Sequence, residues 1–321
     1  MSFSGEVKEE LSRQIPSARH CQLAEIAALI AMSGEIIISE NDHYSIRLHT
    51  ENTSVARKCF TLLKKGLMIK TDIVITRNRY LKKSNVYLIT VTSHDDAIRL
   101  LKAMKFMRPD GSMNDEIALV SHRIIQKDCC RRAFIRGAFL ASGSLSAPEK
   151  FYHFEIVCDA ESKATQLRDI LVGLGMDAKV VSRKRYFVVY IKEGAQITDL
   201  LGLMGANVSL LNLENIRIMK EMRNNVNRKV NCETANINKT VSASVRQIED
   251  IRCVQDRIGL DQLPDALRET AELRLAYPDA SLKELGSMLT PAVGKSGVNH
   301  RLRKISEIAS GFRKDNKEEV L

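Results

Sequence analysis

The stretches "LIAMSGEI" (residues 29–36) and "FLASGSLS" (residues 139–146) decide the fold of this 321-residue chain. Each one closes a run of apolar and small residues with Ser-Gly. The same helix ending therefore occurs twice, with Ser33 and Ser142 in matching places. Such a pair indicates an internal repeat, and a repeat determines the architecture of a chain.

The repeat extends well beyond these two endings. Each copy begins with an apolar helical segment, at residues 23–33 and 133–142, and continues with a strand, a helix, two strands and a helix. Each copy is thus predicted as α-β-α-β-β-α, with room for one more strand at "GEIII" (residues 34–38). The register is supported by three matched pairs: Ser33 with Ser142, Tyr80 with Tyr186 and Met104 with Met204.

Both opening helices carry a stripe of very small side chains. At helical spacing they are Ala24, Ala27, Ala28 and Ala31 in the first copy, and Ala133, Gly137, Ala138 and Ala141 in the second. Two such helices can pack unusually closely, which favours a pseudo-twofold seam between the copies. The alternative is that each stripe makes an ordinary tight contact with its own sheet.

With their small residues, "IAALIAMSG" (residues 26–34) and "IRGAFLASG" (residues 135–143) resemble the LAGLIDADG motif of homing endonucleases. In that family the small residues pack two central helices, and the last acid of each motif is a metal ligand for DNA cleavage. Here Ser33 and Ser142 occupy those acid positions. Because Mg²⁺ prefers anionic oxygens to neutral hydroxyls, we expect the cleavage site to be lost and the protein not to be an enzyme. Glu35 lies nearby, but its counterpart is Ser144, so no carboxylate pair is recovered.

The overall charge indicates a polyanionic partner. The net charge is +10 and the pI is near 9.2. Tryptophan is absent and aromatic residues make up 5%, which disfavours base stacking on single strands and leaves duplex DNA as the natural candidate. No apolar run reaches the ~20 residues of a membrane span, and residues 1–14 lack signal-peptide features. We therefore expect a cytoplasmic, nucleoid-associated protein with no membrane partner.

Cysteine and histidine spacing predicts no metal site and no cofactor. The seven cysteines include no C-x-x-C pair, and the seven histidines are scattered. The adjacent Cys129 and Cys130 could be redox-active, but buried, reduced thiols are the favoured interpretation.

A basic segment is duplicated, as "TRNRY" (residues 76–80) in the first copy and "SRKRY" (residues 182–186) in the second. Period-two alternation places Arg77 with Arg79, and Arg183 with Arg185, on one face of a strand. In LAGLIDADG proteins the equivalent sheets form a saddle over duplex DNA. By that resemblance these arginines form a second surface for DNA or a partner. A solvated strand face is an equal alternative, because arginine pairs alone are unspecific.

The C-terminal part of the chain has the pattern of a helix-turn-helix. We expect a linker at residues 225–240, rich in asparagine, a helical domain at 241–312 and a charged tail at 313–321. "SLKELGSML" (residues 281–289) has capping-box spacing at Ser281 and Glu284, and the last helix buries Val298, Leu302, Ile305 and Ala309. A basic helix in a plain bundle is the alternative. The predicted DNA-binding residues are Lys295, Ser296, Asn299, His300, Arg301, Arg303 and Lys304.

"NRKVNCETANINKTV" (residues 227–241) and "GKSGVNHRLRKISEIA" (residues 294–309), together with the double Ser-Gly ending, resemble the WhiA family of bacterial transcription regulators across essentially the whole chain. The resemblance implies an α+β fold, with LAGLIDADG-like repeats at residues 1–110 and 111–224 before an all-α helix-turn-helix domain. It also implies sequence-specific binding to double-stranded DNA and regulation of genes for cell division, chromosome segregation or sporulation. The partners it implies are an RNA polymerase sigma factor or an iron-sulfur regulator. A nucleoid-architectural or protein-interaction role remains the alternative.

Overall fold

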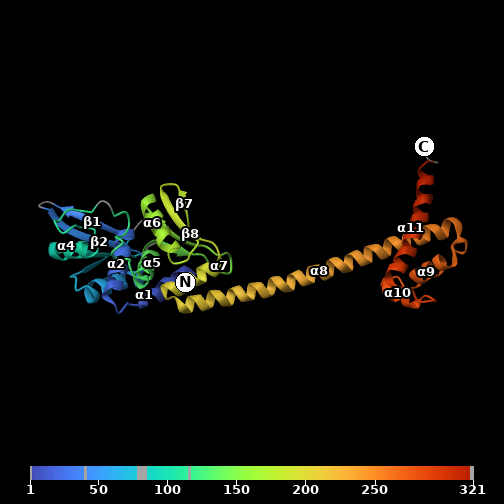
Figure 1. Ribbon diagram of the computed structural model, residues 1–321, viewed down its shortest axis with the longest axis horizontal. Helices are drawn as coiled ribbons and strands as arrows, with labels where there is room; N and C mark the ends of the chain where they lie inside the picture. Colours follow the sequence, from blue (N-terminus) through green and yellow to red (C-terminus); the bar gives the residue numbers. More distant parts are fainter. Residues whose placement is uncertain (1, 40–41, 78–84, 115–116, 319–321) are drawn as a thin grey trace. The chain divides into compact units, whose positions relative to one another are not determined.

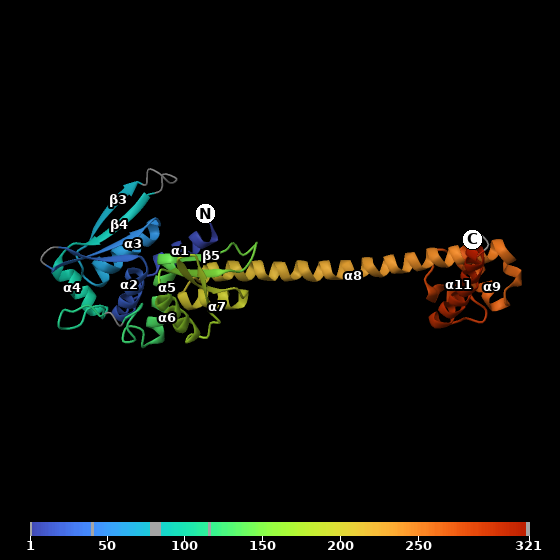
Figure 2. The same cartoon turned by 90° about the horizontal axis from the view of Figure 1, so that it is seen from above.

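The computed structural model describes residues 2–39, 42–77, 85–114 and 117–318, and the chain divides into two compact units, Met1–Lys220 and Glu221–Leu321 (Figures 1 and 2).

The first unit contains the predicted repeat. The first copy comprises α2 (Arg19–Ser33), β1 (Gly34–Ser39), β2 (His43–Thr50), α3 (Thr53–Thr61) with a π-helical turn at Leu62–Gly66, β3 (Asp72–Arg77), β4 (Asn85–Val91) and α4 (His94–Ala103). The second comprises α5 (Asp128–Ser142), β5 (Gly143–Leu145), β6 (Phe154–Cys158), α6 (Glu161–Val172), β7 (Lys179–Arg183), β8 (Tyr186–Ile191) and α7 (Gly194–Met204). The predicted order is confirmed, and the additional strand expected at residues 34–38 is present as β1.

Each copy builds one antiparallel sheet with the same topology. The strand orders are β1-β2-β4-β3 and β5-β6-β8-β7. Period-two alternation buries one face, with Ile46 and Leu48 in β2 and Phe154 and Ile156 in β6 at 2% exposure or less. Helices cover these buried faces, and both copies contribute to one continuous hydrophobic core. The α+β class expected for this part of the chain is confirmed.

Helices α2 and α5 pack side by side and form the predicted seam (Figures 1 and 2). The contact is so close that a Cβ atom on Gly137 would lie 2.4 Å from the Glu25 carbonyl oxygen and 2.9 Å from the Ala28 Cβ. Only a residue without a side chain fits at this point. The small-residue stripes therefore join the two copies, and the alternative of a contact within each copy is wrong.

A buried charge cluster crosses the same seam. The Glu25 carboxylate is fully buried and accepts hydrogen bonds from Arg136 Nε at 2.8 Å and Nη2 at 2.9 Å. It also pairs with the buried Lys58 ammonium, which donates to the Leu11 carbonyl at 2.7 Å. Burial lowers the pKa of Lys58, while the Glu25 charge opposes that shift. These groups connect α1 (Phe3–Arg13), α2, α3 and α5.

Helix α8 (Asn207–Ile258) corrects the prediction of a linker at residues 225–240, because this segment is helical throughout. Its 52 residues contain no proline or glycine, and asparagine weakens a helix without ending it. Apolar residues also recur at three- and four-residue spacing, among them Val226, Val230, Ile237 and Val241, although their side chains are exposed. The asparagine-rich composition of this segment is typical of a linker, but without proline or glycine that composition does not end the helix.

The second unit is helical and begins at Glu221, before the predicted start of the helical domain at residue 241. The end of α8 packs with α9 (Asp265–Ala276), α10 (Leu282–Met288) and α11 (Lys295–Glu318) around one small core. The core residues expected on α11, Val298, Leu302, Ile305 and Ala309, are all buried. Within the described residues, no helix combines the length and apolar character needed to cross a membrane.

Candidate nucleic-acid interface

The short helix α10 begins with the capping box that the sequence predicts. The Ser281 Oγ accepts a hydrogen bond from the Glu284 backbone N–H at 3.3 Å, and the Glu284 carboxylate accepts one from the Ser281 N–H at 2.7 Å. Hydrogen bonds from Ser281 lower the pKa of the exposed Glu284 carboxyl. This pairing satisfies backbone donors at the helix start and sets where α10 begins.

The turn between α10 and α11 is held close to α10. Val293 donates its backbone N–H to the Gly286 carbonyl at 2.9 Å, and a Cβ atom at position 286 would lie 2.1 Å from the Val293 carbonyl oxygen. Glycine at 286 is thus required for the turn to fold back against α10. The compact turn determines how α11 leaves the domain surface.

Helix α11 presents a polar face opposite its buried one. Lys295 lies at its first residue, and no acidic residue occupies the first turn. A positive side chain at the positive end of a helix dipole is suited to contact a phosphate. Ser296, Asn299, His300, Arg303 and Lys304 are all exposed, in the sector of the helix that faces away from the core.

Two of the predicted residues have partners within the domain. Arg301 is half-buried, and its Nη1 donates to the Ala266 carbonyl and to Thr270 Oγ1, both at 3.3 Å, so its guanidinium faces α9. These hydrogen bonds occupy the side chain that the sequence predicts to bind DNA, and the DNA contact of Arg301 stays a prediction. Arg303 is 78% exposed and pairs at 3.4 Å with Glu307, an acidic neighbour on the same face.

The two serines at the ends of α2 and α5 have different surroundings. Ser33 donates its hydroxyl to the Leu29 carbonyl at 2.8 Å within its own helix, the local bond available to a serine there. The Ser142 hydroxyl is buried and has no hydrogen-bond partner among the described residues. Neither helix ends on a carboxylate, the group that a LAGLIDADG nuclease requires at these positions.

The nearby acids are engaged in separate polar contacts. Glu35 lies opposite Arg47 in the β1–β2 register, 3.8 Å from its guanidinium. On the second sheet Glu155 accepts hydrogen bonds from Ser144 Oγ at 3.0 Å and from Arg183 Nη1 at 3.4 Å. Glu35 and Glu155 therefore occupy different strands of their sheets and do not form a repeat-related pair.

The predicted pairing of Arg183 and Arg185 on one strand face is wrong. Strand β7 ends at Arg183, and Lys184 and Arg185 form a two-residue turn with Lys184 at φ 57°. The turn breaks the alternation, and Arg185 packs over the Tyr186 ring at 5.0 Å. In the first copy the backbone of β3 ends at Arg77, while Arg79 lies outside the described residues.

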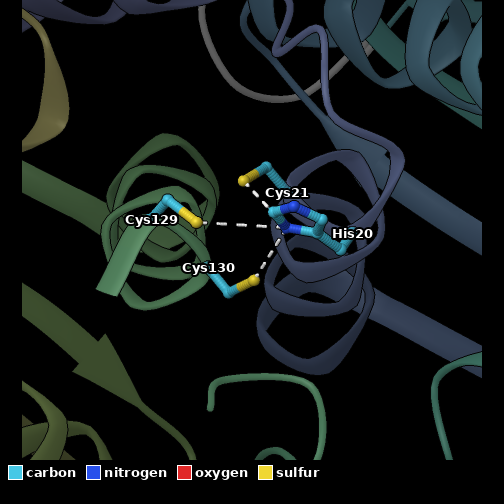
Figure 3. A group of neighbouring side chains, drawn as sticks. All are labelled: His20, Cys21, Cys129 and Cys130. Carbon is cyan, nitrogen blue, oxygen red and sulfur yellow. Dashed lines mark hydrogen bonds between the residues drawn. The ribbon is translucent and has the colours of Figure 1, made fainter. Parts of the chain in front are cut away.

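Sequence spacing missed one group of side chains altogether. His20 and Cys21 at the start of α2 and Cys129 and Cys130 at the start of α5 point toward one another across the seam (Figure 3). Their ligand atoms all lie within 4.8 Å of one another, and no similar group of His, Cys, Asp and Glu occurs elsewhere in the described part of the chain. Burial first, and then the neighbouring Cys129, raise the pKa of Cys21 to about 12.

A signal for this group was present in the repeat. The register that matches Ser33 with Ser142 also matches His20 with Cys129 and Cys21 with Cys130. Packing two related helices about a pseudo-twofold axis brings such matched pairs face to face. A search for metal spacing along the chain alone cannot find ligands that only the symmetry brings together.

Comparisons with known proteins agree with this architecture. Residues 19–107 match the WhiA N-terminal LAGLIDADG-like domain, residues 131–223 the WhiA LAGLIDADG-like domain, and residues 226–309 the WhiA C-terminal HTH domain. A probable cell division protein WhiA from Lachnoclostridium phytofermentans is 52% identical over 98% of this chain and 100% of its own length. Another from Heliobacterium modesticaldum is 51% identical over 97% of both chains. The crystal structure of a full-length WhiA protein from Thermatoga maritima is 25% identical, with a TM-score of 0.59 over 97% of this chain and 98% of that one.

Proposed function

The chain belongs to the WhiA family, and on that basis we propose that it is a sequence-specific regulator of transcription that binds duplex DNA through α11. The observation that carries the proposal is the combination of a short capped helix, a tight turn and a second helix with an exposed polar row. In helix-turn-helix proteins the second helix enters the major groove and reads base edges with its N-terminal residues.

The residues of the exposed row divide into two roles. Asn299 and Arg303 have side chains that can make bidentate contacts to adenine and guanine, respectively, so we assign base reading to them. Lys295 and Lys304 are assigned to phosphates, which position the protein without reading sequence. Ser296 and His300 lie on the same face and are assigned supporting contacts. Arg301 takes a phosphate only if its bonds to α9 open.

Relatives named as probable cell division proteins suggest the biological setting of this DNA binding. The proposed targets are genes for cell division, chromosome segregation or sporulation, in a cytoplasmic protein associated with the nucleoid. A sigma factor of RNA polymerase or an iron-sulfur regulator is the proposed protein partner. Immunoprecipitation of bound DNA across the genome, followed by sequencing, would test the site and the target genes together.

The proposal also includes the loss of endonuclease activity. Ser33 and Ser142 offer hydroxyls where anionic metal ligands are needed. Incubating the protein with Mg²⁺ and supercoiled or genomic DNA should leave the DNA intact. Cleavage that disappears in a Glu35→Gln variant would contradict this part of the proposal.

Three variants separate the two roles of α11. Arg303→Ala and Asn299→Ala should each reduce the preference for the specific site by about 1–3 kcal/mol, because a base contact is lost. Lys295→Ala should weaken binding to specific and random duplexes alike and lower the salt slope by about 1. The matched control is Arg246→Ala, an exposed arginine on α8 of the same unit.

Binding titrations on specific and random duplexes at two salt concentrations provide the measurement. Equal losses on both duplexes for Arg303→Ala, Asn299→Ala and Lys295→Ala would refute the base-reading assignment. If the unmodified protein showed no sequence preference at physiological salt, the architectural role expected of a chain with net charge +10 would replace regulation.

A further inference from the structure

We propose that His20, Cys21, Cys129 and Cys130 together bind one Zn²⁺ ion, which joins the two repeats at the N-terminal ends of α2 and α5 (Figure 3). Each repeat supplies two adjacent ligands, so the ion would lie on the pseudo-twofold axis between them. Burial follows the same symmetry, because Cys21 and Cys130 are buried while His20 and Cys129 are exposed.

The distances from His20 Nδ1 to the three sulfurs are close to those around a single tetrahedral ion. Bond lengths of ~2.3 Å to sulfur and ~2.05 Å to nitrogen place a nitrogen and a sulfur ligand about 3.6 Å apart, and two sulfurs about 3.8 Å apart. The Nδ1 atom of His20 lies 3.1 Å from Cys130 Sγ, 3.3 Å from Cys21 Sγ and 4.0 Å from Cys129 Sγ. The three separations straddle the tetrahedral value, and only small side-chain shifts would equalise them.

Hydrogen bonds to His20 alone do not account for the cluster. The Nδ1 atom of a neutral imidazole has one proton or one lone pair, so it can make one good hydrogen bond. Three sulfurs gathered around one nitrogen leave at least two of them without a matching donor or acceptor at that atom. A cation at the common centre gives every one of the four atoms a partner.

The donor set selects the ion. Thiolates and imidazole are soft or borderline ligands that favour Zn²⁺ over Mg²⁺ or Ca²⁺, and Cys₃His is a recurrent set in structural zinc sites. An iron-sulfur cluster would bind its ligands through separate iron atoms and so hold them farther apart than one ion does. With three thiolates, the zinc complex carries one net negative charge, which the N-terminal ends of α2 and α5 stabilise.

The position of the cluster indicates a structural role. All four ligands come from the protein, which leaves no open position for a catalytic water. Cys21 and Ser33 are separated by twelve residues of one helix, or about 18 Å at 1.5 Å per residue. The zinc site is therefore at the opposite end of the central helices from the positions where a LAGLIDADG nuclease binds its metals.

Metal analysis of the full-length protein, purified with a reductant and without chelators, tests the proposal. We expect one zinc ion per chain by inductively coupled plasma mass spectrometry. The Cys129→Ser/Cys130→Ser double variant should lose at least ten-fold of that content. A matched control is Cys158→Ser/Cys232→Ser, which removes one buried and one exposed cysteine outside the cluster and should retain zinc.

Cobalt gives a second measurement that needs no variant. Replacing zinc by Co²⁺ in the unmodified protein should produce strong visible bands and a sulfur-to-cobalt charge-transfer band, the signature of a tetrahedral thiolate site. His20→Ala should shift these bands and weaken binding, while Cys158→Ser/Cys232→Ser should leave them unchanged. The cobalt spectrum of the unmodified protein tests the proposal even if the Cys129→Ser/Cys130→Ser variant does not fold.

Three outcomes would overturn the proposal. One is reduced, folded protein that contains no zinc and gives no cobalt bands. Another is zinc content in the Cys129→Ser/Cys130→Ser variant equal to that of the unmodified protein. The third is a set of cobalt bands that neither His20→Ala nor Cys129→Ser/Cys130→Ser changes.

Discussion

Replacing Glu25 by glutamine tests how strongly the buried charge cluster holds the two repeats together. In the native protein one fully buried carboxylate serves two cations, Lys58 and Arg136. Glu25→Gln keeps the shape of the side chain but leaves both cations without a counter-charge. Removing one partner from a buried ion pair typically costs about 3–5 kcal/mol. For a unit of this size that corresponds to a fall in Tm of roughly 6–20 °C, at about 2–4 °C per kcal/mol.

Far-ultraviolet circular dichroism of the full-length chain during chemical and thermal unfolding is the assay, because the absence of tryptophan rules out its fluorescence as a probe. Hydrogen exchange of peptides from α2 assigns the transition to the first unit. The control is Glu9→Gln, which removes the carboxylate of an exposed pair with Arg13 and should cost no more than about 1 kcal/mol.

A further variant separates charge from packing in the same cluster. Lys58→Met removes one cation and leaves the Glu25–Arg136 pair electrically balanced, so it should cost less than Glu25→Gln. If Glu25→Gln destabilised the protein by less than 1 kcal/mol, or less than Lys58→Met did, the reasoning from uncompensated buried charge would be refuted.

Burial lowers the pKa of Lys8 from 10.5 to about 8. The charged side chain therefore destabilises the folded state below pH 8, and this cost decreases as the pH rises from 8 to 10.5. Lys8→Met removes the buried charge and should raise Tm at pH 7. Thermal scans should show that gain shrinking above pH 8, and a constant gain would contradict the assignment. Glu10 accepts hydrogen bonds from the first N–H groups of α8, and Glu10→Ala should cost about 0.5–2 kcal/mol, with faster hydrogen exchange at residues 207–212. Gly137→Ala should cost about 1–3 kcal/mol in urea unfolding because its Cβ meets Glu25, whereas Gly311→Ala, with open space around it, should not destabilise the protein.

The fold was predictable from the sequence because its strongest signals repeat. Ser33 and Ser142 end equivalent helices, and stripes of alanine at helical spacing are typical of two helices in close contact. The helix-turn-helix was predictable for a local reason, since the Ser281–Glu284 box and the buried spacing from Val298 to Ala309 depend only on neighbours along the chain.

The failures concern features that depend on distant or competing contacts. The turn at Lys184 and Arg185 overrides strand alternation, and the hydrogen bond from Arg301 to α9 is a contact that spacing along the chain does not reveal. Residues 225–240 are helical because nothing there breaks a helix, although their composition is typical of a linker. The Cys and His cluster depends on the pairing of two helices more than a hundred residues apart, which no local spacing reveals.

The close packing at Gly137 and the shared carboxylate of Glu25 mean that neither repeat has a complete interior of its own. Arg136 of the second repeat forms its ion pair with Glu25 of the first repeat. Lys58 of the first repeat pairs with the same Glu25 carboxylate. The two copies are therefore duplicated in sequence but form a single folding unit. A chain severed between α4 and α5 would regain structure only by complementation, with both fragments present in the same solution.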